Sequence, residues 1–407
     1  MSQSVKTPNL TDHLIEKDAK YGALNYAPLP VVLKKGQGVY VWDVEGKKYF
    51  DMLSAYSALN QGHCHPRIVA AAKKQIERLT LTSRAFHNDV MGDLLVKIST
   101  LTGFEKVLLM NSGAEGVETA IKAMRRWGYI EKGIPKDQAE IIVCEENFHG
   151  RTTTIVSFST DPLSYEGFGP GTPGFRIIPY DDPDALEKAI TPETCGFLVE
   201  PIQGEAGVKV PDSKYMAKVR DICTRNQVLL CADEIQTGLG RTGSMLCYEH
   251  SGIRPDIVIL GKALSGGLYP ISAIACDDSI MKVFEPGNHG STYGGNPLAS
   301  AIGVEALSVI VEEHLAEKAT VNGLYFQEKL RSLRHPAIKE IRGKGLLLAI
   351  EFTEPLAKVF CKKLKEEGLL AKDTHDVTVR FAPPLIITQD QIDEAFSSIE
   401  AAISQLP

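Results

Sequence analysis

The chain has 407 residues, of which 44 are Lys or Arg and 51 are Asp or Glu, so its formal net charge is −7. Hydrophobic residues make up 43% and charged residues 23% of the sequence, which is typical of a globular protein and excludes a disordered chain. A mildly acidic chain is poorly suited to neutralising a phosphate backbone, so no nucleic-acid partner is expected. The length suggests two or three domains.

Apolar runs and cysteines indicate the compartment. No apolar run exceeds five residues, whereas a membrane-spanning helix needs about 20. The first residues, MSQSVKTPNLTDHL, lack the apolar core of a secretory signal. The eight cysteines are scattered singly, which argues against disulfides and cysteine-ligated zinc. We therefore expect a cytoplasmic protein without a metal site or a membrane partner, whose cysteines are mostly small core residues.

The N-terminal part predicts a helix over 11–20, a hairpin over 39–51 with its turn at Glu45-Gly46, and a helix from about Pro66. The apolar stripe of this last helix consists of Ile68, Ala72, Ile76 and Leu79.

From about 105 to 276, short apolar runs alternate with helical or loop segments. The runs are Val107–Met110, Ile141–Cys144, Phe197–Val199, Val228–Ala232, Ile257–Leu260 and Ile271–Cys276. Strands that are apolar on both faces and separated by helices predict an α/β fold, with a mostly parallel sheet covered by helices. In such sheets the site lies beyond the carboxyl ends of the strands, so the residues that follow each run are the candidates.

Towards the C-terminus long helices dominate, and the last one has a capping box at Thr388 and Gln391. The helices are predicted at 298–314, 324–334, 356–367 and 389–405. We predict a smaller α+β domain built from both termini. Its N-terminal part is residues 1–55 and its C-terminal part is 293–407, while 56–292 form the large domain.

Three strand ends carry chemically useful residues. After Met110, the sequence Asn-Ser-Gly-Ala-Glu begins a helix, whose free backbone N–H groups suit a phosphate. After Ala232 comes Asp233, a carboxylate whose burial is costly unless it is paired. After Gly261 comes Lys262, and a buried lysine tends to be neutral and therefore nucleophilic. Taken singly, each feature has an ordinary explanation: a capped turn, a surface acid, or a lysine that reaches solvent.

Together these features match the needs of pyridoxal phosphate (PLP). Its phosphate needs the helix N-terminus, its ring nitrogen needs a carboxylate in order to stay protonated, and its aldehyde needs a lysine amine. The spacing of 262 − 233 = 29 residues lets Asp233 and Lys262 come from successive strand ends.

Two other patterns favour structural roles. Residues 238–243 match G-x-G-x-x-G, but they open no periodic helix, so the context of a dinucleotide site is missing. His63 and His65 have no further ligands at a metal spacing, so a loop at a helix start is favoured. Two other classes of function stay open at this point. One is an oxidoreductase that binds a nicotinamide through the 238–243 glycines, and the other is a scaffold without enzymatic activity.

Over essentially its whole length, the chain resembles the class III PLP-dependent aminotransferases of fold type I. The resemblance is carried by MNSGAE, VEPIQGEAG, ADEIQTGLGRTG, PDIVILGKALSGGLYP and HGSTYGGNPLA. Further segments resemble the ornithine-type members, among them YGALNYAPLPVVL, FDMLSAYSALNQGHCHP, NFHGRT and VRFAPPL. The resemblance implies a large domain with a mostly parallel, seven-stranded-type sheet.

For the cofactor, the resemblance implies that Lys262 forms the Schiff base and carries the transferred proton, and that Asp233 pairs with the ring nitrogen. It also implies further contacts: Ser112, Gly113 and Ala114 around the phosphate, Phe148 stacked on the ring, Gln236 beside the ring hydroxyl, and Thr292 at the phosphate of a neighbouring subunit. The last contact implies a homodimer with shared sites.

For the substrates, the resemblance implies L-ornithine and 2-oxoglutarate, which use one pocket in turn. Arginine binds carboxylates bidentately. Arg151 resembles the arginine for the carboxylate of ornithine, and Arg380 resembles that for the keto acid. Glu205 resembles the carboxylate that masks Arg380 while ornithine is bound, and Tyr26 and Tyr56 match pocket-lining positions.

The expected reaction moves the terminal amino group of ornithine to the 2-oxo acid, which yields glutamate 5-semialdehyde and an amino acid. The nearer alternatives are 4-aminobutyrate and N-acetylornithine as amino donors; Tyr56 and the NYAPLP segment argue against both by resemblance. Gly116 departs from the alanine that is common in the family, which predicts at most a looser helix start.

Overall fold

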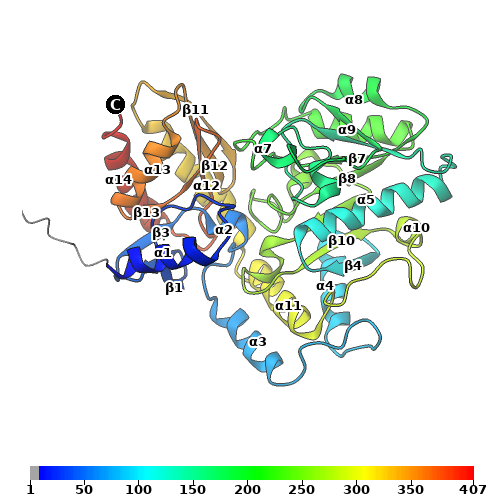
Figure 1. The fold of residues 1–407 in the computed structure, drawn as a ribbon, viewed down its shortest axis with the longest axis horizontal. Coiled ribbons are helices and arrows are strands. Elements are labelled where there is room, and N and C mark those ends of the chain that lie inside the picture. Colours follow the sequence, from blue (N-terminus) through cyan, green and yellow to red (C-terminus); the bar gives the residue numbers. More distant parts are fainter. Residues whose placement is uncertain (1–8) are drawn as a thin grey trace, which may run out of the picture.

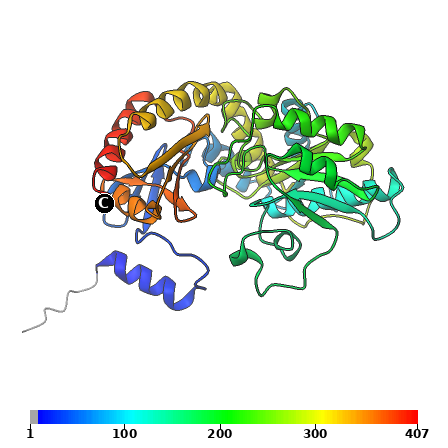
Figure 2. The same ribbon diagram turned by 90° about the horizontal axis from the view of Figure 1, so that it is seen from above.

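The structure, a computed structural model, describes residues 9–407. Residues 1–8, which begin the predicted 1–55 segment, lie outside the described residues. Figures 1 and 2 show two lobes: a large lobe around a seven-stranded sheet and a small lobe around two four-stranded sheets. Between residues 9 and 407, no helix is both long and apolar enough to cross a membrane.

The seven-stranded sheet has the order β4-β10-β9-β8-β7-β5-β6. Its strands are β4 (Lys106–Met110), β5 (Glu140–Cys144), β6 (Phe175–Ile178), β7 (Thr194–Val199), β8 (Leu229–Asp233), β9 (Ile257–Leu260) and β10 (Ser272–Cys276). The strands β5 to β9 pair in parallel, and β10 runs antiparallel to both β4 and β9. All six predicted runs are strands, and the mostly parallel sheet is confirmed. β6 escaped prediction because it is a half-exposed edge strand interrupted by Arg176.

Helices cover both faces of this sheet, as predicted. One face packs against α5 (Gly113–Ile130) and the other against α8 (Pro183–Ala189) and α9 (Tyr215–Arg225). The rest of the large lobe contains α3 (Pro66–Ile76), α4 (Met91–Thr102) and α11 (Pro297–Glu312), with the short helices α2 (Ser54–Ser57), α6 (Thr153–Val156), α7 (Pro162–Tyr165), α10 (Asp278–Met281), η1 (Cys247–Ser251) and η2 (Lys262–Ser265). α11 packs against α3 and α4. The predicted domain boundaries at 55/56 and 292/293 stay predictions.

Both ends of the chain build the small lobe. Its N-terminal sheet has the order β1-β2-β3-β13, and β13 from the C-terminal part pairs in parallel with β3. Its C-terminal sheet has the order β11-β12-β15-β14. The elements are α1 (Leu10–Tyr21), β1 (Leu33–Gln37), β2 (Tyr40–Asp43), β3 (Lys48–Asp51), α12 (Leu315–Ser332), β11 (Ile338–Lys344), β12 (Leu347–Phe352), α13 (Ala357–Glu366), β13 (Leu369–Leu370), β14 (Lys372–Thr374), β15 (Thr378–Phe381) and α14 (Gln389–Ile403). The predicted capping box of α14 is present.

The apolar stripe predicted after Pro66 is partly wrong. Ile68 is buried in α3, but Ile76 is 59% exposed, and Leu79, which is 42% exposed, lies beyond the end of the helix. α3 projects from the edge of the molecule in Figure 1 and packs against α11, and its last turn buries Gln75 and leaves Ile76 exposed. Helical spacing therefore identified the helix but not the extent of its buried face.

The glycines at 238–243 join the two lobes. Arg241, between them, donates from Nη1 to the carbonyl oxygens of Leu346 at 2.9 Å and Pro383 at 2.6 Å, and from Nη2 to Oδ1 of Asn60 at 2.6 Å. Burial lowers the pKa of Arg241 to about 9. Gly243 has a φ of +99°, and a Cβ there would lie 2.5 Å from Oγ1 of Thr320 on α12. These glycines therefore serve close packing.

The histidines of the HCHP segment have structural partners. Nε2 of His63 lies 2.7 Å from a carboxylate oxygen of Asp51, and Nε2 of His65 lies 3.0 Å from one of Glu313. All eight cysteines are free, and all except Cys64 are buried, as expected for small core residues.

Candidate active site

Five strand ends of the seven-stranded sheet, those of β4, β5, β7, β8 and β9, meet at one cavity of about 210 Å³. The residues that line it are Gly113, Ala114, Phe148, His149, Gly150, Glu200, Ile202, Asp233, Ile235, Gln236, Thr237 and Lys262. A second cavity, of about 290 Å³, adjoins it through Gly113 and Lys262 and is also lined by Ser112. The structure thus brings together Lys262, Asp233, the turn after β4, Phe148 and Gln236, as the sequence predicted.

The turn after β4 presents backbone donors to the cavity. Ser112 caps α5: its Oγ accepts from the N–H of Glu115 at 3.2 Å, while the Glu115 carboxylate accepts from the N–H of Ser112 at 2.7 Å. The first N–H groups of a helix have no intrahelical partner. Among the described residues, those of Gly113 and Ala114 have no acceptor. They are therefore available to an anionic ligand. The capping box is complete despite Gly116.

Asp233, at the end of β8, is fixed by a histidine. It is 4% exposed and accepts from Nδ1 of His149 at 2.7 Å and from the N–H of Ile235 at 3.0 Å. Burial alone would lower the pKa of His149, but the bond to Asp233 raises it overall. Sequence reasoning missed His149, although it lies in the loop that follows the apolar run of β5.

A second missed residue is Glu200, which directly follows β7. Its carboxylate accepts from the N–H of Phe148 at 3.1 Å and so fixes the loop that carries this ring. Burial raises the pKa of Glu200 to about 7, although His149 opposes the shift. Its position after the apolar run Phe197–Val199 was the available signal.

Lys262 is the first residue of η2, just beyond β9, and has a φ of +44°, in the left-handed region that non-glycine residues rarely adopt. Its amine is buried, and burial lowers its pKa to about 8; Glu205 opposes this shift and Arg380 adds to it. A neutral amine is therefore accessible near physiological pH.

Beyond Gln236, on the side of the small lobe, lie an arginine and a carboxylate. Arg380, on β15, is 1% exposed and donates from Nη1 to Glu205 at 2.8 Å and to Oε1 of Gln236 at 3.1 Å. Gln236 donates from Nε2 to the same carboxylate at 3.0 Å. The guanidinium lies 5.0 Å from the ring centroid of Tyr56. Burial would raise the pKa of Glu205, but Arg380 and then Lys262 lower it to about 2. Glu205 is therefore an anion that covers Arg380.

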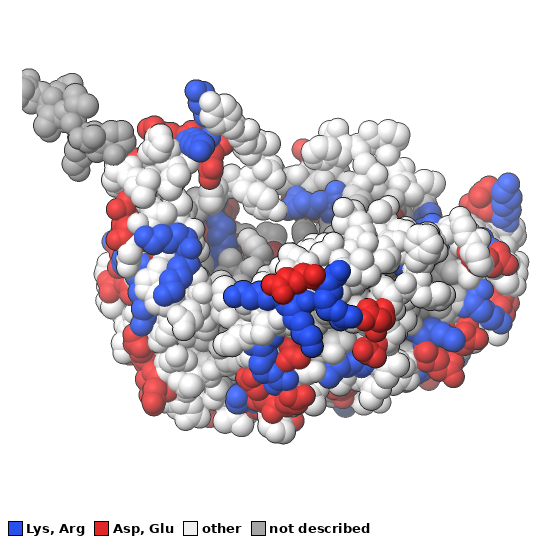
Figure 3. Space-filling model, turned by 90° about the horizontal axis from the view of Figure 1, so that it is seen from below, with Lys and Arg blue, Asp and Glu red and all other residues white. Residues whose placement is uncertain are grey.

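The remaining predicted residues lie further out. Arg151 is exposed, 5.6 Å from the ring centroid of Phe148, and lines a wider cavity of about 630 Å³ together with Glu205. Figure 3 shows the hollow between the lobes, with Lys or Arg side chains visible inside it. Tyr26 is 73% exposed, Thr292 is exposed, and neither lines these cavities of its own chain.

The residues of the inner cavity fit PLP. Two unpartnered N–H groups at a helix N-terminus suit a phosphate, a buried carboxylate suits a protonated ring nitrogen, and the amine of Lys262 has a lowered pKa. A family model described as aminotransferase class-III matches residues 21–403. The chain belongs to the class-III aminotransferase family.

Relatives of this class-III aminotransferase span almost its full length. A protein named ornithine aminotransferase from Brevibacillus brevis is 54% identical and covers 97% of this chain and 98% of its own. The crystal structure of ornithine aminotransferase from Toxoplasma gondii ME49 is 46% identical, with a TM-score of 0.96 and 99% of both chains covered. The structure of acetylornithine aminotransferase from Elizabethkingia anophelis is 48% identical, with a TM-score of 0.90, and covers 98% of this chain and all of its own. Class-III aminotransferases are PLP-dependent, and the nicotinamide alternative is thereby set aside.

Proposed function

We propose that this class-III aminotransferase is an ornithine δ-aminotransferase. It moves the terminal amino group of L-ornithine to a 2-oxo acid such as 2-oxoglutarate, with L-glutamate 5-semialdehyde and an L-amino acid as products. The pairing of Arg380 with Glu205 carries the proposal, together with the names of relatives at 54% identity. One pocket must bind an amino donor that ends in a cation and an amino acceptor that carries a second carboxylate. An arginine that a neighbouring carboxylate can cover or release allows the pocket to bind both.

The inner cavity would hold the cofactor. The N–H groups of Gly113 and Ala114, with Ser112, would bind the phosphate, Phe148 would lie on the ring, and Asp233 would face the ring nitrogen, held in place by His149. When bound there, PLP supplies the electron sink that makes a proton on the amine-bearing carbon removable.

The protein's own groups would then direct the proton. Lys262 would carry the proton during the transfer, because burial lowers the pKa of its amine to about 8 and the amine can accept or release a proton near that pH. Gln236 would lie beside the ring hydroxyl of the cofactor, and its Nε2 donates to the Glu205 carboxylate. The buried Glu200 fixes the backbone of Phe148 and so keeps the stacking ring in place.

Two arginines would recognise the substrates. Arg151 donates to Oγ of Ser164 at 3.5 Å and pairs with no carboxylate within residues 9–407, so it is available for the carboxylate of ornithine at the outer cavity. Arg380 would take the carboxylate of the 2-oxo acid once Glu205 moves aside. Tyr56, whose ring lies against Arg380, would narrow the donor subsite, and Tyr26 would contact the amino-acid end of ornithine.

We further propose a homodimer in which Thr292 reaches the phosphate site of the neighbouring subunit. Thr292 is exposed, and several large apolar side chains are exposed on the same chain, including Leu24, Ile76, Phe86 and Tyr293. A cytoplasmic location is also proposed, because free cysteines suit a reducing compartment.

The test is a comparison of amino donors. Holoenzyme is assayed with 2-oxoglutarate and L-ornithine, N-acetylornithine or 4-aminobutyrate, and the highest kcat/KM is expected for ornithine. N-acetylornithine is the second candidate because of the similar Elizabethkingia anophelis structure. A preference for either competitor would contradict the proposal. The Lys262→Ala variant should lose turnover and the yellow absorption of bound cofactor.

A further inference from the structure

Glu205 lies on a short closed loop, residues 204–208. Gln203 and Lys209 pair across its base, with N–H···O distances of 3.0 and 3.2 Å. Gly207 and Val208 have φ angles of +97° and +55°, and a positive φ is rare for a β-branched residue such as Val208. A loop in such a conformation persists only when contacts from outside hold it.

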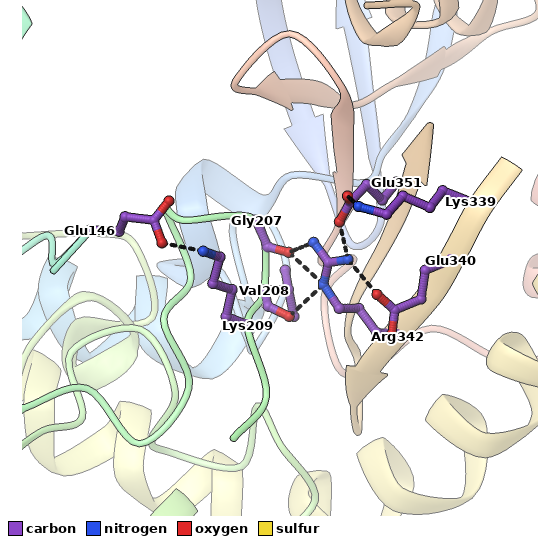
Figure 4. A network of polar contacts seen from close by, with 8 residues as sticks. All are labelled: Glu146, Gly207, Val208, Lys209, Lys339, Glu340, Arg342 and Glu351. Atoms are coloured by element: carbon purple, nitrogen blue, oxygen red, sulfur yellow. Dashed lines mark hydrogen bonds and ion pairs between the residues drawn. The ribbon is translucent and has the colours of Figure 1, made fainter. Parts of the chain in front are cut away.

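Arg342 on β11 supplies the main outside contact, as Figure 4 shows. Its Nε donates to the carbonyl oxygens of Gly207 at 3.0 Å and Val208 at 3.1 Å, and its Nη2 donates to that of Gly207 at 2.6 Å. A Cβ on Gly207 would lie 3.2 Å from Nη2, so the guanidinium lies directly against the backbone. The two residues of the loop with a positive φ, Gly207 and Val208, are the two that Arg342 holds.

The small lobe holds the other half of the loop as well. Arg380 donates to the carbonyl oxygen of Gly204 at 3.1 Å, and Oγ1 of Thr374 donates to that of Glu205. The loop leaves and re-enters the large lobe, yet its backbone acceptors are taken by side chains of the C-terminal sheet. The Glu205 carboxylate is consequently placed by the small lobe.

Arg342 is itself oriented by acids. Its Nη1 donates to Glu340 at 2.8 Å and to Glu351, and Lys339 pairs with Glu351 at 2.6 Å (Figure 4). The Arg342 side chain is 14% exposed. A planar guanidinium can bind two carbonyls and a carboxylate at once, whereas an ammonium cannot. Lys339 offers a cation in the same cluster that touches no carbonyl of the loop.

We propose that Arg342 is a positioning residue for the choice between donor and acceptor. By holding the carbonyls of Gly207 and Val208, it keeps the Glu205 carboxylate on Arg380. The inference rests on the proposed function, in which Glu205 masks Arg380 during the amine half-reaction. Without the guanidinium the loop relaxes, Arg380 is masked less, dicarboxylates bind more tightly, and cationic donors bind less well.

The test uses the Arg342→Met holoenzyme and glutarate, an unreactive dicarboxylate, titrated by calorimetry. Glutarate should bind about fivefold more tightly than to the parent enzyme, while KM for ornithine rises by a similar factor. KM for 2-oxoglutarate should fall or stay unchanged. The matched control, Lys339→Met, should leave all three constants unchanged. Unchanged glutarate affinity in Arg342→Met, or an equal rise in both KM values, would overturn the proposal.

A double-mutant cycle separates positioning from a general structural role. In a Glu205→Ala background, Arg342→Met should change glutarate affinity less than twofold, because the group through which it acts is gone. The same shift in both backgrounds would contradict the inference. Arg342→Lys, which is less disruptive to folding, should resemble Arg342→Met, and parent-like affinity would count against the proposal. The glutarate titration needs no amino donor, so its result does not depend on which donor the enzyme prefers. An error in the proposed donor would appear only in the comparison of amino donors.

Discussion

Two arginines are almost completely buried, and their surroundings differ in kind. Arg241, at the junction of the lobes, is 0% exposed and donates to two backbone carbonyls and one amide oxygen. Arg380, at the cavity, is 1% exposed and has a carboxylate partner, Glu205, whose side chain is 26% exposed. Burial of the arginine is therefore the same, whereas the charge and the exposure of its partner differ.

The difference separates a structural cation from a functional one. The acceptors of Arg241 are two backbone carbonyls and the amide oxygen of a buried side chain. These neutral groups are fixed by the fold, so no ligand can take their place on the guanidinium. The acceptor of Arg380 is an anion that reaches the cavity, and another carboxylate can take its place. A buried arginine whose acidic partner can be exchanged is a recognition site.

Replacing Arg241 should have the largest effect on stability. In Arg241→Met three buried acceptors lose their donor, so the free energy of unfolding should fall by about 4 kcal/mol. Urea denaturation of the holoenzyme measures it. The control is Arg225→Met, which removes an exposed ion pair and should change nothing measurable. A loss below about 1 kcal/mol for Arg241→Met would mean that the comparison is wrong.

Replacing Arg380 should instead affect one substrate. In Arg380→Met the kcat/KM for 2-oxoglutarate should fall more than a hundredfold, because the 2-oxo acid loses the charged partner of its carboxylate. This fall corresponds to a loss of about 3 kcal/mol in transition-state stabilisation. The rate of the ornithine half-reaction, followed alone by stopped-flow absorbance, should change far less. Equal losses of rate in both half-reactions would show that Arg380 does not act selectively on the 2-oxo acid.

Neutralising Glu205 should have a smaller and opposite effect. In Glu205→Gln the amide keeps a hydrogen bond to Arg380 but no longer opposes its charge. Glutarate should therefore bind about tenfold more tightly, which is about 1.4 kcal/mol. Weaker binding, measured by the same titration, would show that Glu205 does not mask the arginine.

The two arginines should also differ in their effect on Lys262. In the apoenzyme the fraction of neutral Lys262 rises as the pH rises through its pKa of about 8. The rate of PLP capture, followed by absorbance, should rise over the same range. Arg380 lowers this pKa, so Arg380→Met should move the midpoint to higher pH. Arg241→Met should leave the midpoint unchanged, and a shift there would contradict the distinction.

The sequence predicted the large sheet and the residues at its strand ends because both depend on local patterns. Apolar runs mark buried strands, and Lys262 and Asp233 directly follow two of them. The tertiary partners were not predictable in this way: His149 lies 84 residues from Asp233, and Arg241 lies 181 residues from Asn60. No periodicity in the sequence connects groups so far apart.

The glycines at 238–243 illustrate the same limit. The sequence context argued against a dinucleotide site but gave no positive role, because the contacts of Gly243 come from α12, more than 70 residues further along the chain. Likewise, the apolar stripe of α3 predicted burial of Ile76, which is 59% exposed. The roles assigned to the site residues, Tyr26, Arg151 and Thr292 among them, stay predictions.

The partly exposed carboxylate of Glu205 has a consequence for inhibitor design. A compound that carries a second carboxylate must displace an existing ion pair before it gains its own, and part of its binding free energy is lost in that exchange. A compound with a terminal cation can approach the same carboxylate while the pair stays intact. Selective ligands for this pocket should therefore be cationic at the end that faces the small lobe.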